Sequence, residues 1–160
     1  MDFKIARKNM VENQIRANKV TSLSVINAFL DVPREKFVPD ALQEISYVDE
    51  DIQLSRNRFM MKPMILARLF QSLNLKGNEN ILHVGSNSGY GSAILSRMCS
   101  SVISLESDKK LFETSIHTFS NMGFDNVVPL HGSMENGVEK EAPFDIIFIE
   151  GSIETEPKSL

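Results

Sequence analysis

The chain has 160 residues, of which 42% are hydrophobic and 24% are charged, and this is enough for one globular domain with its own core. Its net charge of -4 is uneven, because residues 1–80 carry 12 basic and 10 acidic side chains while residues 81–160 carry 5 and 11. An acidic second half argues against a dedicated nucleic-acid-binding protein. No apolar run is long enough to span a membrane, the N-terminus lacks a signal-peptide core, and the single cysteine, Cys99, excludes a disulfide within the chain. We therefore expect a cytoplasmic protein that binds neither nucleic acid nor a membrane.

Residues 1–62 predict an N-terminal helical and connecting segment. Apolar residues at helical spacing predict a helix over residues 4–20, and a second helix begins after Thr21 or Ser22 and ends before Pro33. Residues 33–42 predict short turns, since two prolines interrupt them. Residues 48–62 show no clear periodicity and predict an irregular connection.

Residues 63–160 predict an α/β part that forms one compact domain with the first segment. A helix begins at Pro63, whose ring suits a first helical turn. Beyond it, strands alternate with helices, and this alternation predicts a parallel sheet with right-handed crossovers. The predicted strands are 80–84, 101–106, 126–130 and 144–150, and the predicted helices between them are 88–99 and 108–122.

The stretch "ILHVGSNSGYGSAIL", residues 81–95, predicts a strand, a glycine-containing turn and a helix, an arrangement that often holds a nucleotide-like ligand. A dinucleotide turn requires glycine at its first, third and sixth positions, but these hold Gly85, Asn87 and Tyr90. The spacing of Gly85, Gly89 and Gly91 resembles that of short-chain dehydrogenases. Those enzymes also need a tyrosine and a lysine four residues apart, and this chain has no such pair.

S-adenosylmethionine is the third ligand considered, and it fits the turn better because it has no pyrophosphate. Asn87 tolerates a left-handed backbone better than most residues, so it can keep the turn. Glu106 ends the second strand, where a carboxylate can accept hydrogen bonds from both ribose hydroxyls. The alternative for Glu106 is a solvated strand end. The residues predicted to bind the cofactor around this turn are His83, Gly85, Ser86, Asn87, Ser88, Gly89 and Glu106.

Two further segments complete the predicted cofactor site. The loop after the third strand holds Gly132, Ser133 and Met134, which would border the adenine, or would form an ordinary turn with an apolar anchor. Glu150 ends the fourth strand, beside the first, where such sheets open their cleft; a helix-capping role is the alternative. The three histidines show no metal-ligand spacing, and we predict no metal site.

From about Ala6 to the last residue, the sequence resembles the protein-L-isoaspartate O-methyltransferase family. The resemblance is carried by the motifs "MVENQI", "VPREKFVP", "YVDEDIQL", "KPMILARLFQSLNL", "VGSNSGYGSAILSRM", "VISLE" and "APFDIIFIEG". It implies a Rossmann-like S-adenosylmethionine-dependent methyltransferase fold with extra N-terminal helices. It also implies an enzyme that methylates the side carboxylate of isoaspartyl residues in damaged proteins or peptides, whose ester then closes to a succinimide.

The sequence departs from the family pattern just before Pro63. Family members carry a segment that ends Thr-Ile-Ser-Gln-Pro, whose hydroxyls steady the substrate carboxylate; here the matching residues are Phe59, Met60, Met61 and Lys62. Phe59, Met60 and Met61 therefore occupy the catalytic motif positions without their hydroxyls. They pack into a core, or they line an apolar pocket for another acceptor. A methyltransferase for another acceptor and a degenerate, non-catalytic nucleoside-binding or interaction domain thus stay as alternatives.

The chain stops shortly after its fourth strand, so the predicted sheet is incomplete and ends on a hydrophobic "DIIFI" edge. Such an edge is a pairing hazard. We expect a truncated form; the alternative is self-association through this edge.

Overall fold

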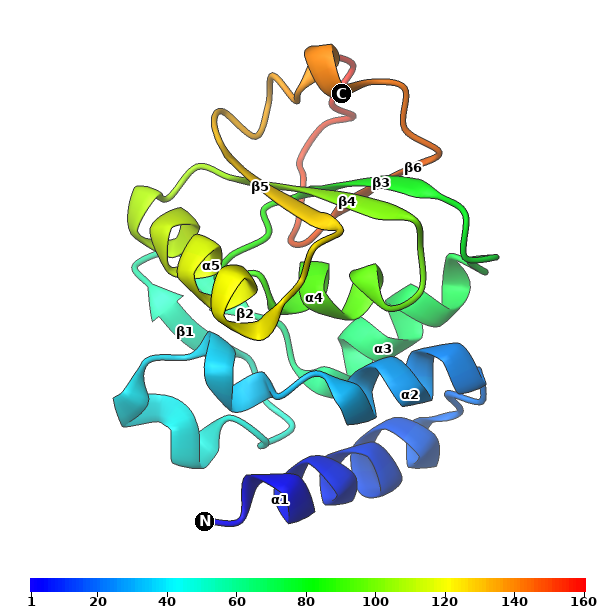
Figure 1. Ribbon diagram of the computed structural model, residues 1–160, viewed down its shortest axis with the longest axis vertical. Coiled ribbons are helices and arrows are strands. Elements are labelled where there is room, and N and C mark those ends of the chain that lie inside the picture. The colour runs from blue at the N-terminus through cyan, green and yellow to red at the C-terminus, as the bar shows by residue number, and fades with distance from the viewer. The chain divides into compact units, whose positions relative to one another are not determined.

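The structure is a computed structural model that describes residues 1–160, and its contacts divide the chain into two compact units, Met1–Leu75 and Lys76–Leu160. The helix that begins at Pro63 thus belongs to the first unit, whereas the sequence grouped it with the α/β part. Figure 1 shows the chain from its blue N-terminal helices to its red C-terminal tail. Each unit is described by itself below.

The first unit begins with a helical segment whose pitch changes along its length. Helix α1 (Phe3–Met10) starts at Asp2, whose carboxylate accepts hydrogen bonds from the next turn. A wider π-helical turn, η1 (Val11–Ile15), and a tighter 3₁₀ turn, η2 (Arg16–Asn18), continue it until Lys19 turns left-handed. Of the apolar residues predicted to form a buried stripe on this segment, Met10, Val11, Ile15 and Val20 are buried, whereas Ile5 is 59% exposed. Helix α2 (Leu23–Asp31) begins after Ser22 and ends before Pro33, as predicted.

Short 3₁₀ turns η3 (Arg34–Phe37) and η4 (Asp40–Ile45) follow, which confirms the turns expected around the prolines. Arg34 is fully buried in this segment. Its Nε donates to the Ser46 carbonyl at 2.6 Å, and its Nη2 donates to the Met61 carbonyl at 3.0 Å. One arginine therefore ties the turns to a segment some 27 residues further along the chain.

The expectation of an irregular connection over residues 48–62 was wrong. Strands β1 (Ile52–Ser55) and β2 (Arg58–Met60) pair as an antiparallel hairpin with an irregular register near Ser55. These strands are too short to show an alternating pattern, and the bulge shifts what pattern there is. Helix α3 (Pro63–Ser72) follows the hairpin and begins at the predicted proline.

The second unit contains a parallel sheet in the order β5-β4-β3-β6. Its elements follow the predicted alternation closely, and the central strands match the prediction residue for residue. Their bounds are β3 (Asn80–Val84), α4 (Tyr90–Ser96), β4 (Ser101–Glu106), α5 (Lys109–Met122), β5 (Val127–His131), η5 (Glu139–Glu141) and β6 (Ile146–Ile149).

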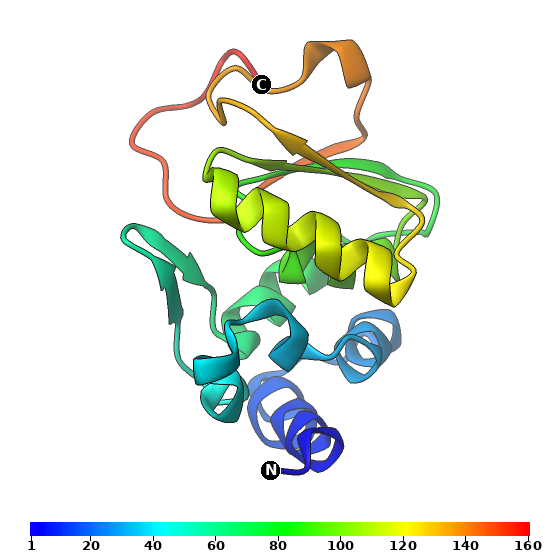
Figure 2. The ribbon, with the colours of Figure 1, turned by 60° about the vertical axis from the view of Figure 1, so that its left-hand side comes forward.

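The two faces of this sheet are covered differently. Figures 1 and 2 show α4 and α5 on the same side of the strands, while the chain after β5 and the C-terminal tail run over the other side. On that second face Leu82, Val84 and Leu105 form an apolar cluster. Loop and tail residues, among them Met134, Phe144 and Leu160, pack against it. Alternation along β3 therefore directs Leu82 and Val84 to the loops and His83 to α4.

Strand β6 lies at one end of the sheet beside β3, as predicted from the sequence. Ile147 on this edge strand is 40% exposed. No helix is both long enough and apolar enough to cross a lipid bilayer.

Candidate functional site

The turn between β3 and α4 is built on left-handed backbone at three positions. Gly85, Asn87 and Gly89 have φ of 76°, 56° and 97°. Asparagine is one of the few residues other than glycine that enters this region routinely, and the Asn87 side chain also donates to the Gly85 carbonyl at 3.2 Å. The prediction that Asn87 preserves the turn is confirmed by its backbone.

Glu106 fastens this turn to the next strand. Its Oε2 accepts the backbone N–H of Asn87 at 2.7 Å, and its Oε1 accepts those of Ser107 and Asp108, each at 2.9 Å. The side chain is 1% exposed, so the alternative of a solvated strand end does not hold. The carboxylate that is predicted to accept hydrogen bonds from the ribose hydroxyls therefore lies directly against the turn and fixes its backbone.

The turn carries three consecutive buried polar side-chain atoms that have no hydrogen-bond partner within the chain. They are Ser86 Oγ, Asn87 Oδ1 and Ser88 Oγ. All three residues are at most 3% exposed. Buried polar atoms are nearly always hydrogen-bonded, and an unpaired one costs about 1–3 kcal/mol. Three together, beside a buried carboxylate, form a surface suited to a polar ligand.

A second buried polar group lies on the other side of the turn. Glu150 is 6% exposed, and its Oε2 lies 3.0 Å from Nε2 of the fully buried His83. The other ring nitrogen, Nδ1, lies 2.7 Å from Ser92 Oγ, which in turn donates to Ser104 Oγ at 2.9 Å. Strands β3, β4 and β6 and helix α4 are thus joined by one chain of buried polar side chains.

Gly91 in α4 makes room for that pair. A Cβ atom at this position would lie 2.5 Å from Glu150 Oε2 and 2.8 Å from His83 Cε1. Any larger residue would therefore displace the carboxylate or the imidazole.

Backbone hydrogen bonds place the two carboxylates on either side of Gly85. Gly85 N donates to Leu105 O and Glu150 N donates to Val84 O, both at 2.9 Å. Parallel pairing of Val84 with Leu105 and with Ile149 puts Glu106 and Glu150 in one row across the carboxyl ends of three strands. Such ends, where the strand order reverses, are where open α/β sheets bind ligands.

The loop after β5 begins beside the candidate site and continues into the apolar core of the second sheet face. Gly132 N donates to the Glu106 carbonyl at 3.1 Å, so this loop starts beside the carboxylate's backbone. Met134 packs against the apolar cluster of the second sheet face, and Ser133 is exposed. Contact of these three residues with an adenine stays a prediction.

The motif positions Phe59, Met60 and Met61 lie in the first unit, at the end of its hairpin. Met60 is 1% exposed and belongs to the core, whereas Phe59 is 48% exposed. The backbone around them is fixed by Arg34 at the Met61 carbonyl and by Asp51, whose carboxylate accepts the Lys62 N–H at 2.8 Å. Core packing, the first alternative for this stretch, describes Met60 but not the half-exposed Phe59, and an apolar acceptor pocket at this stretch stays a prediction.

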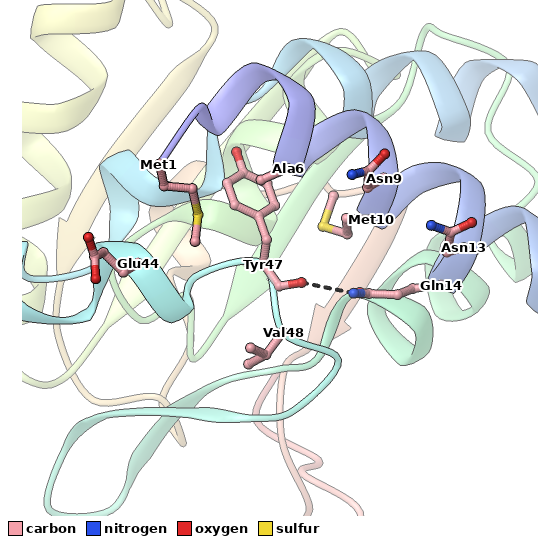
Figure 3. Close-up of a pocket in the computed structure, with 9 residues that line it drawn as sticks. All are labelled: Met1, Ala6, Asn9, Met10, Asn13, Gln14, Glu44, Tyr47 and Val48. Atoms are coloured by element: carbon pink, nitrogen blue, oxygen red, sulfur yellow. Dashed lines mark hydrogen bonds between the residues drawn. The ribbon is translucent and has the colours of Figure 1, made fainter.

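A pocket of about 280 Å³ lies elsewhere in the first unit, between the N-terminal helical segment and the 44–48 segment. In Figure 3 the Gln14 amide donates to the Tyr47 carbonyl, at 2.8 Å, on the wall of this pocket. None of the predicted site residues lines it. Its lining residues are Met1, Ala6, Asn9, Met10, Asn13, Gln14, Glu44, Tyr47 and Val48.

The sequence did not single out Ser92 or Ser104, and it noted Gly91 only for its spacing from Gly85 and Gly89, although all three support the Glu150 side of the site. A serine at a position of β4 that alternation makes inward-facing was the available signal for Ser104. Ser92 and Gly91 sit in the buried first turns of α4, where small residues carry no periodic signal.

Comparison with known proteins decides the family. The sequence model described as "Protein-L-isoaspartate(D-aspartate) O-methyltransferase (PCMT)" matches residues 5–160. The chain belongs to the protein-L-isoaspartate O-methyltransferase family. Relatives bearing that enzyme's name include one from Anaeromyxobacter sp. (strain Fw109-5), 34% identical over 96% of this chain and 63% of its own length. Another, from Syntrophobacter fumaroxidans, is 32% identical over 100% of this chain and 75% of its own length.

Solved structures share the fold of this family member. One protein-L-isoaspartate O-methyltransferase superposes with a TM-score of 0.83 at 24% identity, covering 96% of this chain and 50% of that chain. A Plasmodium falciparum structure, described as such an enzyme in complex with S-adenosyl-L-homocysteine, gives 0.78 at 24% identity over 99% and 78%. The Rossmann-like methyltransferase fold predicted from the sequence is thereby confirmed. The chain spans 63% and 64% of the length of the first two curated relatives it matches.

Proposed function

We propose that this chain binds S-adenosylmethionine at the Gly85–Gly89 turn and transfers its methyl group to the side carboxylate of isoaspartyl residues in proteins. The observation that carries the proposal is the trio of buried, unpartnered polar atoms on Ser86, Asn87 and Ser88 beside Glu106. These atoms offer the donors and acceptors that an adenosine ligand requires, and Glu106 supplies the negative charge for its ribose hydroxyls. Family membership supports the same assignment.

The chemistry makes few demands on the chain. The cofactor supplies a methyl group bound to a sulfonium sulfur. Because that sulfur departs as a neutral thioether, no general acid is needed to protonate the leaving group. The acceptor carboxylate is already ionised at neutral pH, so the chain needs no general base. Its residues act by holding the two reactants in line, and such orientation contributes up to about 7–11 kcal/mol.

A second candidate acceptor follows from Phe59. This side chain is 48% exposed at the position where the resemblance implies a hydroxyl, and Met60 beside it is buried. An exposed aromatic ring favours an apolar acceptor over a charged carboxylate. A non-catalytic, nucleoside-binding domain is the third candidate.

Binding and methyl transfer are measured separately to distinguish these candidates. Calorimetric titration with S-adenosylhomocysteine should give heat for the wild type, and the Glu106→Ala variant should lose it. Absence of heat with the wild type contradicts cofactor binding. Transfer of a labelled methyl group to an isoaspartyl peptide is then compared with transfer to the aspartyl peptide of the same sequence. Methyl transfer to other acceptors but not to the isoaspartyl peptide would favour the second candidate, a methyltransferase for an apolar acceptor. Cofactor binding without any methyl transfer would favour the third, a non-catalytic nucleoside-binding domain.

The hydroxyls missing from the motif supply a further test. The double variant Phe59→Thr/Met61→Ser should raise transfer to the isoaspartyl peptide, because it restores side chains that can steady a carboxylate. Unchanged transfer in a folded double variant would show that these positions do not control the acceptor.

The remaining predictions belong to this proposal. The acidic second half of the chain supports the proposal that it has no nucleic-acid partner. The single cysteine suits the reducing cytoplasm, where we propose that the protein works without a membrane partner. Self-association would use the β6 edge, where Ile147 is exposed.

A further inference from the structure

Glu150 is a buried carboxylate with acceptor capacity that the fold leaves unused. Its Oε2 lies 3.0 Å from His83 Nε2, but the two atoms are not aligned as a hydrogen bond, and neither has another partner. The residue is 6% exposed and directly follows β6 at the carboxyl end of the sheet. Oε2 is enclosed by His83 and Gly91, so a cationic donor at this edge of the sheet would reach the carboxylate through its other oxygen and offset the cost of burying the charge.

The position of this carboxylate is fixed by its surroundings rather than by solvent. His83 is held by the Ser92 and Ser104 hydroxyls on one side, and its ring lies 5.3 Å from the ring of Phe148 on β6. Gly91 lies so near that a Cβ atom there would come within 2.5 Å of Glu150 Oε2. A charge held in this way costs little reorganisation when a ligand arrives.

The spacing of the two carboxylates fits the length of the proposed cofactor. Glu106 and Glu150 flank Gly85 in one row, so their backbones are two strand spacings apart, about 10 Å. In adenosyl thioethers, the ribose hydroxyls and the amino group lie at opposite ends of an extended arm of comparable length. If Glu106 holds the ribose, the ammonium end of the ligand reaches Glu150.

We propose that Glu150 accepts the ammonium group of the cofactor's amino-acid arm, and that His83, Ser92 and Ser104 position its carboxylate. This inference rests on the proposed function, because it needs the adenosine end of the ligand to lie at Glu106. It makes Glu150 a specificity-determining residue, which distinguishes the full cofactor from nucleosides that lack the amino acid.

Calorimetry with three ligands tests this assignment. S-adenosylhomocysteine carries the ammonium, its desamino analogue lacks it, and 5′-methylthioadenosine lacks the whole amino acid. In the Glu150→Gln variant, affinity for S-adenosylhomocysteine should fall at least tenfold, while affinity for 5′-methylthioadenosine should stay within twofold of wild type. The wild type should bind the desamino analogue more weakly than S-adenosylhomocysteine by a similar factor. The Glu150→Gln variant should bind the desamino analogue as well as the wild type does. Glu141→Gln, which removes an exposed charge from the same unit, is the matched control.

Gly91→Ala provides a second test that leaves the charge of Glu150 in place. The new methyl group would lie 2.5 Å from Oε2, so it should displace the carboxylate and weaken S-adenosylhomocysteine but not 5′-methylthioadenosine. This variant decides the question if Glu150→Gln does not fold. Equal loss of both ligands in either folded variant, or loss of neither, overturns the role of Glu150 while leaving cofactor binding intact. A wild type that binds none of the three ligands overturns the proposed function and this inference with it.

Discussion

Replacing Glu106 by glutamine should destabilise the chain even without a ligand, because this carboxylate holds the turn together. It accepts three backbone N–H groups while 1% exposed. Glutamine is nearly isosteric but keeps only one acceptor oxygen. In the less costly orientation of the glutamine amide, its oxygen still accepts the backbone N–H groups of Ser107 and Asp108. Its NH₂ group then faces the Asn87 N–H, which is left without an acceptor.

The expected cost follows from those contacts. One buried N–H left unpaired costs about 1–3 kcal/mol, and the two hydrogen bonds that remain lose their charge assistance. We therefore expect the free energy of unfolding to fall by about 2–4 kcal/mol. The Asn87 amide should also lose protection against hydrogen exchange, because the turn has lost its anchor.

Urea denaturation and amide exchange measure the two effects on the same sample. The exposed-site variant Glu141→Gln should stay within about 0.5 kcal/mol of wild type. A Glu106→Gln protein that is as stable as this control, with Asn87 still protected, would refute the view that the carboxylate organises the turn.

Three further outcomes are expected. Met60→Ala should lower the free energy of unfolding by about 2–5 kcal/mol because Met60 is core, whereas Phe59→Ala, at a half-exposed site, should cost less than about 1.5 kcal/mol in the same denaturation assay. Asn87→Val should cost about 1–2 kcal/mol, since a β-branched residue resists φ of 56°, and Asn87→Gly should be close to neutral; equal costs would contradict the backbone argument. Burial, with a smaller contribution from Glu79, raises the pKa of the Cys99 thiol from 9.0 to about 12, so the unfolded thiol ionises first and stability falls between pH 9 and 12. When the free energy of unfolding is measured against pH, the Cys99→Ala variant should lack the decrease that the thiol causes between pH 9 and 12. A single titrating group contributes a slope of less than about 1.4 kcal/mol per pH unit.

The strands and helices around the turn could be predicted because each carries its own local signal. Residues 80–84 and 101–106 are apolar runs bounded by polar or flexible residues, and the structure places strands at these same bounds. The left-handed Asn87 followed from the known tolerance of asparagine for that conformation.

Tertiary contacts decided what the sequence did not reveal. The end of the 52–60 hairpin is held partly by the buried Arg34, which donates to the Met61 carbonyl from 27 residues earlier in the sequence. The local sequence pattern does not indicate this contact. The contact between His83 and Glu150 was not predicted either, although β6 was expected beside β3, because the local pattern does not show which partner a buried side chain meets. Local pattern thus located each carboxylate, while sheet pairing decided what each carboxylate contacts.

The way the hairpin end is anchored has a consequence for how this enzyme family can diversify. Arg34 and Asp51 hold residues 61 and 62 through their main-chain atoms alone. The exposed side chain at position 59 can therefore be exchanged without loosening the peptide backbone that carries it. Under the proposed function, acceptor preference would then change through a few substitutions at this exposed position, while the Gly85–Gly89 turn stays as it is.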